Sequence, residues 1–182
     1  MFSFYGSKMM TTGYGGMVVS KNKKLADKAR DYRQFDHRRT YYPRFNFMMS
    51  DINAALGLTQ LEQFPTFMRK RRLIYDKYIE ICYSKGWKFQ QPAQGCLANC
   101  YEFVLRMPHK TIQRLKKHLW DNGIDTVIPI QHYELLHNYL HLDKSKFPVA
   151  EELSRTTLAL PIYPKMVDTK SYETVLKALR GF

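Results

Sequence analysis

The stretch that decides the fold is Ser3-Phe4-Tyr5-Gly6-Ser7-Lys8-Met9-Met10-Thr11-Thr12-Gly13-Tyr14-Gly15-Gly16, and the apolar run Met17-Val18-Val19 follows it directly. The glycines before this run predict a short strand, which the chain enters through a turn with positive φ or close backbone approach. A lone lysine in a loop is usually a solvated charge. Lys8 lies beside a rigid turn, which can hold its amine in a fixed direction next to a ligand.

Two further blocks of sequence accompany the first. One is Asn46-Phe47-Met48-Met49-Ser50-Asp51-Ile52-Asn53-Ala54-Ala55-Leu56-Gly57-Leu58-Thr59-Gln60-Leu61, and the other is Phe147-Pro148-Val149-Ala150-Glu151-Glu152 with Leu158-Ala159-Leu160-Pro161-Ile162-Tyr163-Pro164. In this order and spacing, the three blocks resemble the DegT/StrS family of pyridoxal-phosphate aminotransferases, which act mostly on nucleotide-linked keto-sugars. Tyr14 stands where the family usually has an acid, and Met48 stands where it usually has an arginine.

The resemblance implies an α/β fold, namely the C-terminal half of an aspartate-aminotransferase-like, fold type I transferase. Residues 1–86 would be the C-terminal remnant of the large cofactor-binding domain with its long connecting helix, and residues 87–182 would be the small α/β domain. In the family, the other half carries the aromatic ring that stacks on the cofactor and the aspartate that pairs with the pyridine nitrogen. We therefore expect a homo-oligomer, most simply a dimer, that is inactive alone. A separately encoded N-terminal half or a truncated reading frame would each explain the missing part.

The same resemblance implies roles for three residues at the cofactor. Lys8 would be the catalytic residue that forms a Schiff base with pyridoxal 5′-phosphate, and the Ser3 hydroxyl would donate to the cofactor phosphate. Asn46 would reach into the cofactor site of the partner subunit, although an asparagine before a helix is commonly a turn residue.

Three further residues are candidates for contact with the substrate. His132 and His137 resemble a family segment near the substrate entrance, although histidines at such positions are often packing or surface residues. Arg38 lies in the charged, aromatic segment 36–43, which we expect to be a loop. Such a loop is usually solvated, but a guanidinium group also fits a phosphate.

Local patterns predict most of the secondary structure. Asn22 is placed to cap a helix that carries Leu25, Ala29 and Tyr32, and Ser50 or Asp51 is placed to cap the next. Pro65 is expected to open a separate helix, 65–84, whose basic cluster Arg69–Arg72 needs partners outside the helix. The remaining expected elements are strand 101–107, helix 109–122, strand 124–128, helix 149–157, extended segment 158–160 and helix 169–180 capped by Asp168.

The composition is that of a folded protein. Hydrophobic residues make up 45% and aromatic residues 14% of the 182 residues, and these proportions argue against disorder. No apolar stretch approaches the ~20 residues of a membrane span, and no signal-peptide pattern is evident. The three cysteines are too few for a disulfide framework, and no two further ligands accompany Cys96 and Cys100, so we expect reduced thiols, no metal site and a cytoplasmic protein.

The formal net charge of +13 raises nucleic acid as a partner. No nucleic-acid-reading module is recognisable, and most of the excess lies in residues 1–86, which favours an acidic partner half or an anionic substrate such as a nucleotide diphosphate. A different class of function also stays open. The chain could be a noncatalytic remnant or scaffold that associates with itself through apolar surface on residues 1–86.

Overall fold

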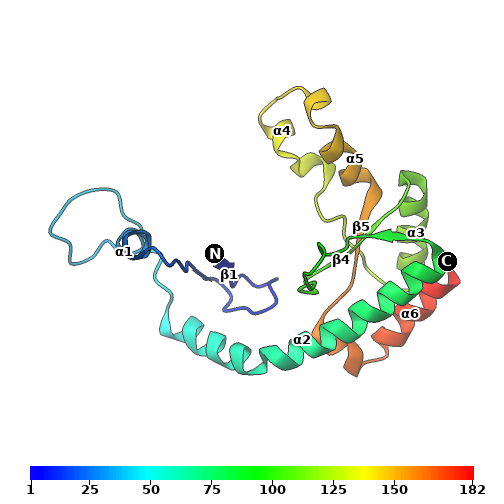
Figure 1. The fold of residues 1–182 in the computed structure, drawn as a ribbon, viewed down its shortest axis with the longest axis horizontal. Coiled ribbons are helices and arrows are strands. Elements are labelled where there is room, and N and C mark those ends of the chain that lie inside the picture. The colour runs from blue at the N-terminus through cyan, green and yellow to red at the C-terminus, as the bar shows by residue number, and fades with distance from the viewer. The chain divides into compact units, whose positions relative to one another are not determined.

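The structure is a computed structural model that describes all residues, 1–182. The chain packs as two compact units, Met1–Thr66 and Phe67–Phe182. One long helix, α2 (Asp51–Lys85), contributes residues to both units (Figure 1). None of the helices combines the length and the apolar character that a membrane span requires.

The first unit is small in regular structure. Strands β1 (Phe2–Ser3) and β2 (Gly16–Met17) pair antiparallel, and helix α1 (Lys23–Tyr32) follows. Asn22 caps α1 as predicted, because its side chain accepts a hydrogen bond from the Leu25 amide at 3.3 Å. The buried residues of this unit are Thr12 and Gly57, so its apolar side chains form no core of their own.

Helix α2 corrects the predicted break at Pro65. Ser50 caps the helix, since the Asn53 amide donates to its Oγ at 3.2 Å, but the helix continues through Pro65 to Lys85. Proline removes one hydrogen bond of the helix, yet its fixed φ is itself helical. The sequence signal for a first-turn proline is therefore also compatible with a proline in the interior.

The second unit contains a three-stranded antiparallel sheet with the order β3-β4-β5. In the central pair, Phe103 lies opposite Leu160 and Leu105 lies opposite Leu158. The strands are β3 (Lys88–Phe89), β4 (Phe103–Arg106) and β5 (Thr157–Leu160). The helices are α3 (His109–Asp121), α4 (Leu136–Tyr139), α5 (Pro148–Thr156) and α6 (Ser171–Gly181), with 3-10 turns at His132–Glu134, Lys144–Lys146 and Pro164–Asp168.

One hydrophobic core holds the second unit together. Phe103 and Leu105 alternate onto the covered face of β4, as a half-buried strand requires. The Tyr78 ring lies edge-on to Phe103 with centroids 5.1 Å apart, and its hydroxyl donates to the Pro161 carbonyl at 2.6 Å. Fully buried side chains from α2, α3, β5 and α6 also contribute, among them Ile74, Leu115, Leu119, Leu158 and Leu179.

Two further local predictions were wrong. Residues 124–128 form no strand and make only an isolated bridge between Val127 and Ala159. The Asp125 side chain accepts from the Thr126 amide at 2.8 Å, a local bond that competes with strand pairing. Asp168 does not cap α6, because it ends a 3-10 turn and its carboxylate pairs with Lys70.

The basic cluster of α2 finds partners outside the helix, as predicted. Nη1 of Arg71 donates to the carbonyls of Cys100, Tyr101 and Ile162, at 3.2, 3.2 and 2.7 Å. Arg72 donates to the Ala98 carbonyl at 2.7 Å. These bonds tie the second half of α2 to the loop before β4 and to the segment after β5.

Candidate functional site

Lys8 lies on a short loop that is closed at its base. The Thr12 amide donates to the Phe4 carbonyl at 2.9 Å, and the Thr11 hydroxyl donates to the same oxygen at 3.1 Å. Within the loop, the Lys8 amide donates to the Tyr5 carbonyl at 2.9 Å. The backbone that carries Lys8 is therefore a tight turn whose two ends are held together.

The glycine turn beyond the loop has the geometry that the sequence predicted. Gly13 has φ +80° and Gly15 has φ +149°, conformations that side chains with a Cβ rarely adopt. A Cβ on Gly16 would lie 2.8 Å from the Phe2 carbonyl oxygen of the paired strand. Glycine is therefore required at Gly13 and Gly15 by their positive φ and at Gly16 by the nearby strand backbone.

The first turns of α2 contact Thr12, the residue just before this turn. Asn53 donates through Nδ2 to the Thr12 carbonyl. A Cβ on Gly57 would lie 2.8 Å from the Thr12 methyl group. The sequence analysis did not assign either residue to the site. The signal available for Gly57 was its position inside a helix, where glycine is less stable than alanine and therefore suggests that a neighbour needs the space.

The other residues predicted at the cofactor lie at the surface of the same unit. Ser3 is exposed in β1, and its Oγ accepts from the Tyr5 amide at 3.4 Å. Asn46 is exposed between Phe45 and Phe47, whose rings stack with centroids 4.9 Å apart. A contact of Asn46 with a partner subunit stays a prediction.

Arg38 lies in the irregular segment after α1, as expected for residues 36–43. Its Nε donates to the Gln34 carbonyl at 3.2 Å and lies 3.6 Å from the Asp31 carboxylate. Arg44 binds that carboxylate more closely, at 3.0 Å, and covers the Tyr42 ring at 3.8 Å. Arg38 is thus the looser of the two arginines on Asp31, and its binding of a phosphate stays a prediction.

The side chains around the loop fit pyridoxal phosphate. Lys8 offers a primary amine, the group that condenses with an aldehyde. The Ser3 oxygen accepts from a backbone amide, which leaves its hydroxyl hydrogen to donate to a phosphate oxygen. The two residues stand on one closed segment, five positions apart.

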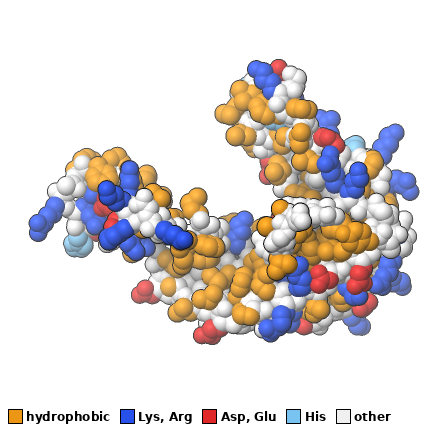
Figure 2. Space-filling view, viewed as in Figure 1, with side chains coloured by type: hydrophobic (Ala, Val, Ile, Leu, Met, Phe, Trp, Pro, Cys, Tyr) orange, Lys and Arg blue, Asp and Glu red, His pale blue; other side chains and the backbone are white.

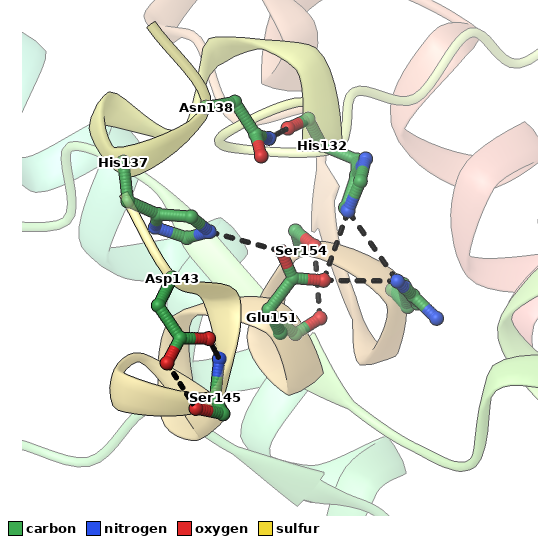
Figure 3. Close-up of polar contacts among 8 residues, drawn as sticks. His132, His137, Asn138, Asp143, Ser145, Glu151 and Ser154 are labelled. Atoms are coloured by element: carbon green, nitrogen blue, oxygen red, sulfur yellow. Dashed lines mark hydrogen bonds and ion pairs between the residues drawn. The ribbon is translucent and has the colours of Figure 1, made fainter. Parts of the chain in front are cut away.

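His132 and His137 converge on one carboxylate in the second unit (Figure 3). Their Nε2 atoms each lie 2.9 Å from an oxygen of Glu151, and Arg155 binds the same carboxylate at 2.9 Å. The His137 ring is 4% exposed and stacks on Phe147 with centroids 4.7 Å apart. Their contact with a substrate stays a prediction.

The same cluster sets the charge of Glu151. Hydrogen bonds from His137 first, and then from His132, lower the pKa of Glu151 to about 2. The ionised carboxylate therefore joins the arm of residues 131–147 to α5 over a wide range of pH.

A groove of about 1140 Å³ lies beside this cluster, within the second unit. Val104 and Arg106 line it from the face of β4 opposite the core, and Phe147 and Leu153 line it from the α5 side. The strand alternation that buries Phe103 and Leu105 thus leaves this second face open.

Comparison with known proteins places this geometry in context. The model of the DegT/DnrJ/EryC1/StrS aminotransferase family matches residues 1–180. GDP-perosamine synthase of Escherichia coli O157:H7 is 31% identical over 171 residues, which cover 91% of this chain and 46% of the synthase.

Solved structures agree with that result. The aminotransferase TlmJ from Streptoalloteichus hindustanus superposes with a TM-score of 0.82 at 28% identity, over 98% of this chain and 50% of TlmJ. S. venezuelae DesV, solved in complex with a ketimine intermediate, superposes with a TM-score of 0.84 at 25% identity, over 99% of this chain and 50% of DesV. The chain thus spans about half the length of the relatives it matches, and the predicted fold class, half of a fold type I transferase, is confirmed.

Proposed function

Because the chain belongs to the DegT/DnrJ/EryC1/StrS aminotransferase family, we propose that it supplies the lysine-bearing half of a pyridoxal-phosphate-dependent aminotransferase. The substrate is a nucleotide-linked keto-sugar and the amino donor is an amino acid, by family resemblance glutamate. The observation that carries this proposal is the closed Lys8 loop beside its glycine turn, in a chain that the family model matches almost from end to end. The relative named GDP-perosamine synthase supports a sugar bound to a nucleoside diphosphate.

Pyridoxal phosphate, when bound, supplies an aldehyde and a ring that withdraws electrons from the reacting carbon. Lys8 would hold the cofactor through its amine and, once free again, would carry a proton between the substrate carbon and the cofactor carbon that flank the transferred nitrogen. Both tasks need the Lys8 nitrogen to return to the same place. The hydrogen bonds at the base of the loop restrict its backbone to one turn, which supports this role.

The surrounding residues bind and orient. The Ser3 hydroxyl donates to the cofactor phosphate, and Asn46 contributes its amide to the cofactor site of a second subunit. Arg38 meets a phosphate of the nucleotide, because a guanidinium presents two parallel donors to phosphate oxygens. By the family resemblance, His132 and His137 contact the sugar.

The complete site needs more of the family fold than these residues supply. The chain covers 46% of the E. coli synthase and 50% of TlmJ. By the family resemblance, the aromatic ring above the cofactor and the carboxylate at its pyridine nitrogen belong to the other half of that fold. Without them the chain alone does not transaminate, since the cofactor lacks its electron sink and part of its binding energy.

A second candidate is a noncatalytic scaffold that associates with itself. The first unit exposes many large apolar side chains (Figure 2), among them Phe2, Val19, Phe47, Ile52, Leu58 and Leu61. Contiguous apolar surface of this kind marks a contact with another protein. A second copy of the chain would cover it without restoring catalysis.

Mixing the two halves tests the proposal. The chain is combined with a polypeptide equivalent to the N-terminal half of its relatives, pyridoxal phosphate, glutamate and a nucleotide-linked keto-sugar, and 2-oxoglutarate formation is measured. We expect activity from the mixture, none from the chain alone, and none when Lys8→Arg replaces the wild-type chain. A stable complex of the two polypeptides that forms no 2-oxoglutarate would instead favour the scaffold.

A further inference from the structure

Helix α2 carries a pair of residues that face the Lys8 loop. Asn53 and Gly57 lie four positions apart, on one face of the helix and one turn apart. Both contact Thr12, the residue at which the loop ends. We propose that Asn53 and Gly57 form a positioning platform for the Lys8 amine, acting through Thr12; the inference rests on the proposed role of Lys8 and deepens it.

Thr12 is the point at which the loop meets the helix. Its side chain and backbone are 2% exposed, although the unit around it has almost no buried residues. Every polar group of Thr12 is used: its amide donates to Phe4, its carbonyl accepts from Asn53, and its hydroxyl donates to the Tyr14 carbonyl at 2.7 Å. Because all three polar groups of Thr12 are hydrogen-bonded, a shift of α2 at Asn53 would move Thr12 and with it the end of the Lys8 loop.

The Asn53 side chain has one defined orientation. Its Oδ1 is in hydrogen-bond contact with the Ser50 hydroxyl, which also caps the Asn53 amide at 3.2 Å. Its Nδ2 is therefore directed at the Thr12 carbonyl. An aspartate at this position has the same shape but no donor, and it would place an oxygen against the carbonyl oxygen.

Gly57 provides the space that Thr12 occupies. A Cβ at Gly57 would lie 2.8 Å from the Thr12 methyl group, which is closer than real carbon atoms approach. The threonine side chain cannot swing away freely, because a β-branched residue is restricted about its first torsion. Alanine at this position would displace Thr12, even though alanine favours a helix over glycine.

The loop is short enough for such a displacement to reach Lys8. Thr12 lies four positions after Lys8, and the Phe4 carbonyl accepts hydrogen bonds from both Thr11 and Thr12 at the loop base. Reacting groups need placement within about 0.5 Å of the productive geometry. A shift of Thr12 therefore changes where the amine is presented.

The test uses two variants and two matched controls in the full chain. Asn53→Asp removes the donor, and Gly57→Ala removes the space. Asn122→Asp is the first control. Like Asn53, Asn122 donates from its side chain to a backbone carbonyl, in this case that of His118 at 2.8 Å. Gly181→Ala is the second, since Gly181 lies in helix α6 and a Cβ there meets nothing within 4 Å.

Two readouts separate positioning from general stability. Hydrogen exchange of the Phe4 and Thr12 amides reports the loop base, and we expect it to accelerate roughly three- to tenfold in both variants, the effect of losing one hydrogen bond. The rate of Lys8 acetylation by acetic anhydride as a function of pH reports the amine, and we expect its profile to change in both variants. Neither readout should change in the controls.

The outcome for Gly57→Ala is the sharpest. If the glycine served only the helix, alanine would stabilise the chain and leave both readouts unchanged, and that result would overturn the proposal. Neither readout uses pyridoxal phosphate. A completed assembly in which Lys8 fails to react with the cofactor would therefore refute the proposed function, while exchange and acetylation still decide the role of the platform.

Discussion

Replacement of Arg71 by methionine measures how α2 is fixed to the second unit. The Arg71 side chain is buried, at 7% exposure, and burial lowers the pKa of its guanidinium. Its three acceptors are neutral carbonyl oxygens, and its Nε has no hydrogen-bond partner. Two effects on the unfolding free energy therefore oppose each other in the Arg71→Met variant. Removal of the buried charge stabilises the fold, and loss of the three hydrogen-bond contacts destabilises it.

The magnitudes decide the direction. The two hydrogens of Nη1 serve three carbonyls, so they amount to about two hydrogen bonds to a charged group, or about 3–6 kcal/mol. Methionine regains about 1–2 kcal/mol, because an apolar side chain carries no desolvation cost in this place. The variant should lose about 1–5 kcal/mol of unfolding free energy, with a central value of about 3 kcal/mol.

Urea unfolding followed by tryptophan fluorescence is a suitable assay, because both tryptophans, Trp87 and Trp120, belong to the second unit. With a slope of about 1–3 kcal/mol per molar urea, the central loss should lower the midpoint by roughly 1–3 M. Arg72→Met is the matched control, since the neighbouring Arg72 donates to one carbonyl and is less buried, and it should cost about 1 kcal/mol. An Arg71→Met chain as stable as the wild type would refute the reasoning. The desolvation of the guanidinium would then destabilise the fold as much as its hydrogen bonds stabilise it.

Three further substitutions test the second unit. The folded pKa of Glu151, about 2, lies below the unfolded value of about 4.3. The ionised carboxylate therefore stabilises the fold above the unfolded pKa, and this contribution disappears as the pH falls toward 2. In Glu151→Gln, the unfolding free energy should thus fall less steeply as the pH is lowered through this range. Unfolding free energies measured between these pH values check this, and equal slopes would contradict the account. Leu105→Ala removes a side chain with 0% exposure and should lower the unfolding free energy by about 2–5 kcal/mol in urea. Leu97→Ala, at 88% exposure, should leave it almost unchanged. Similar losses in both variants would contradict the assignment of Leu105 to the core. Gly123→Ala at φ +74° should lower thermal stability through about 1–2 kcal/mol of backbone strain, and an unchanged melting temperature would contradict that.

The elements that could be predicted are those whose signals are local. The cap of α1 at Asn22 was predicted, as were α3 from the expected helix 109–122 and α5 from the expected helix 149–157. The signal for each depends on residues within one or two turns. The expected glycine turn beside Lys8 also depends on neighbours alone, and it was found as predicted.

What could not be predicted depends on contacts between distant residues. Asn53 binds Thr12 across 41 positions, and Arg71 binds Ile162 across 91. Glu151 gathers His132 and His137 from 19 and 14 positions away. The residue types show that partners are needed, but only the fold shows which partners they are. The helix through Pro65 is a different case, since the same residue is compatible with a helix start and with a helix interior.

The most direct test of the central claim is the identity of the amine that reacts with pyridoxal phosphate. The chain, alone and with the polypeptide that completes it, is treated with pyridoxal phosphate and then borohydride, and the modified peptide is identified by mass spectrometry. The account predicts that the fixed pyridoxyl group lies on Lys8 and that Lys8→Arg abolishes it. A completed assembly whose label is spread over surface lysines such as Lys21, with none enriched at Lys8, would contradict it.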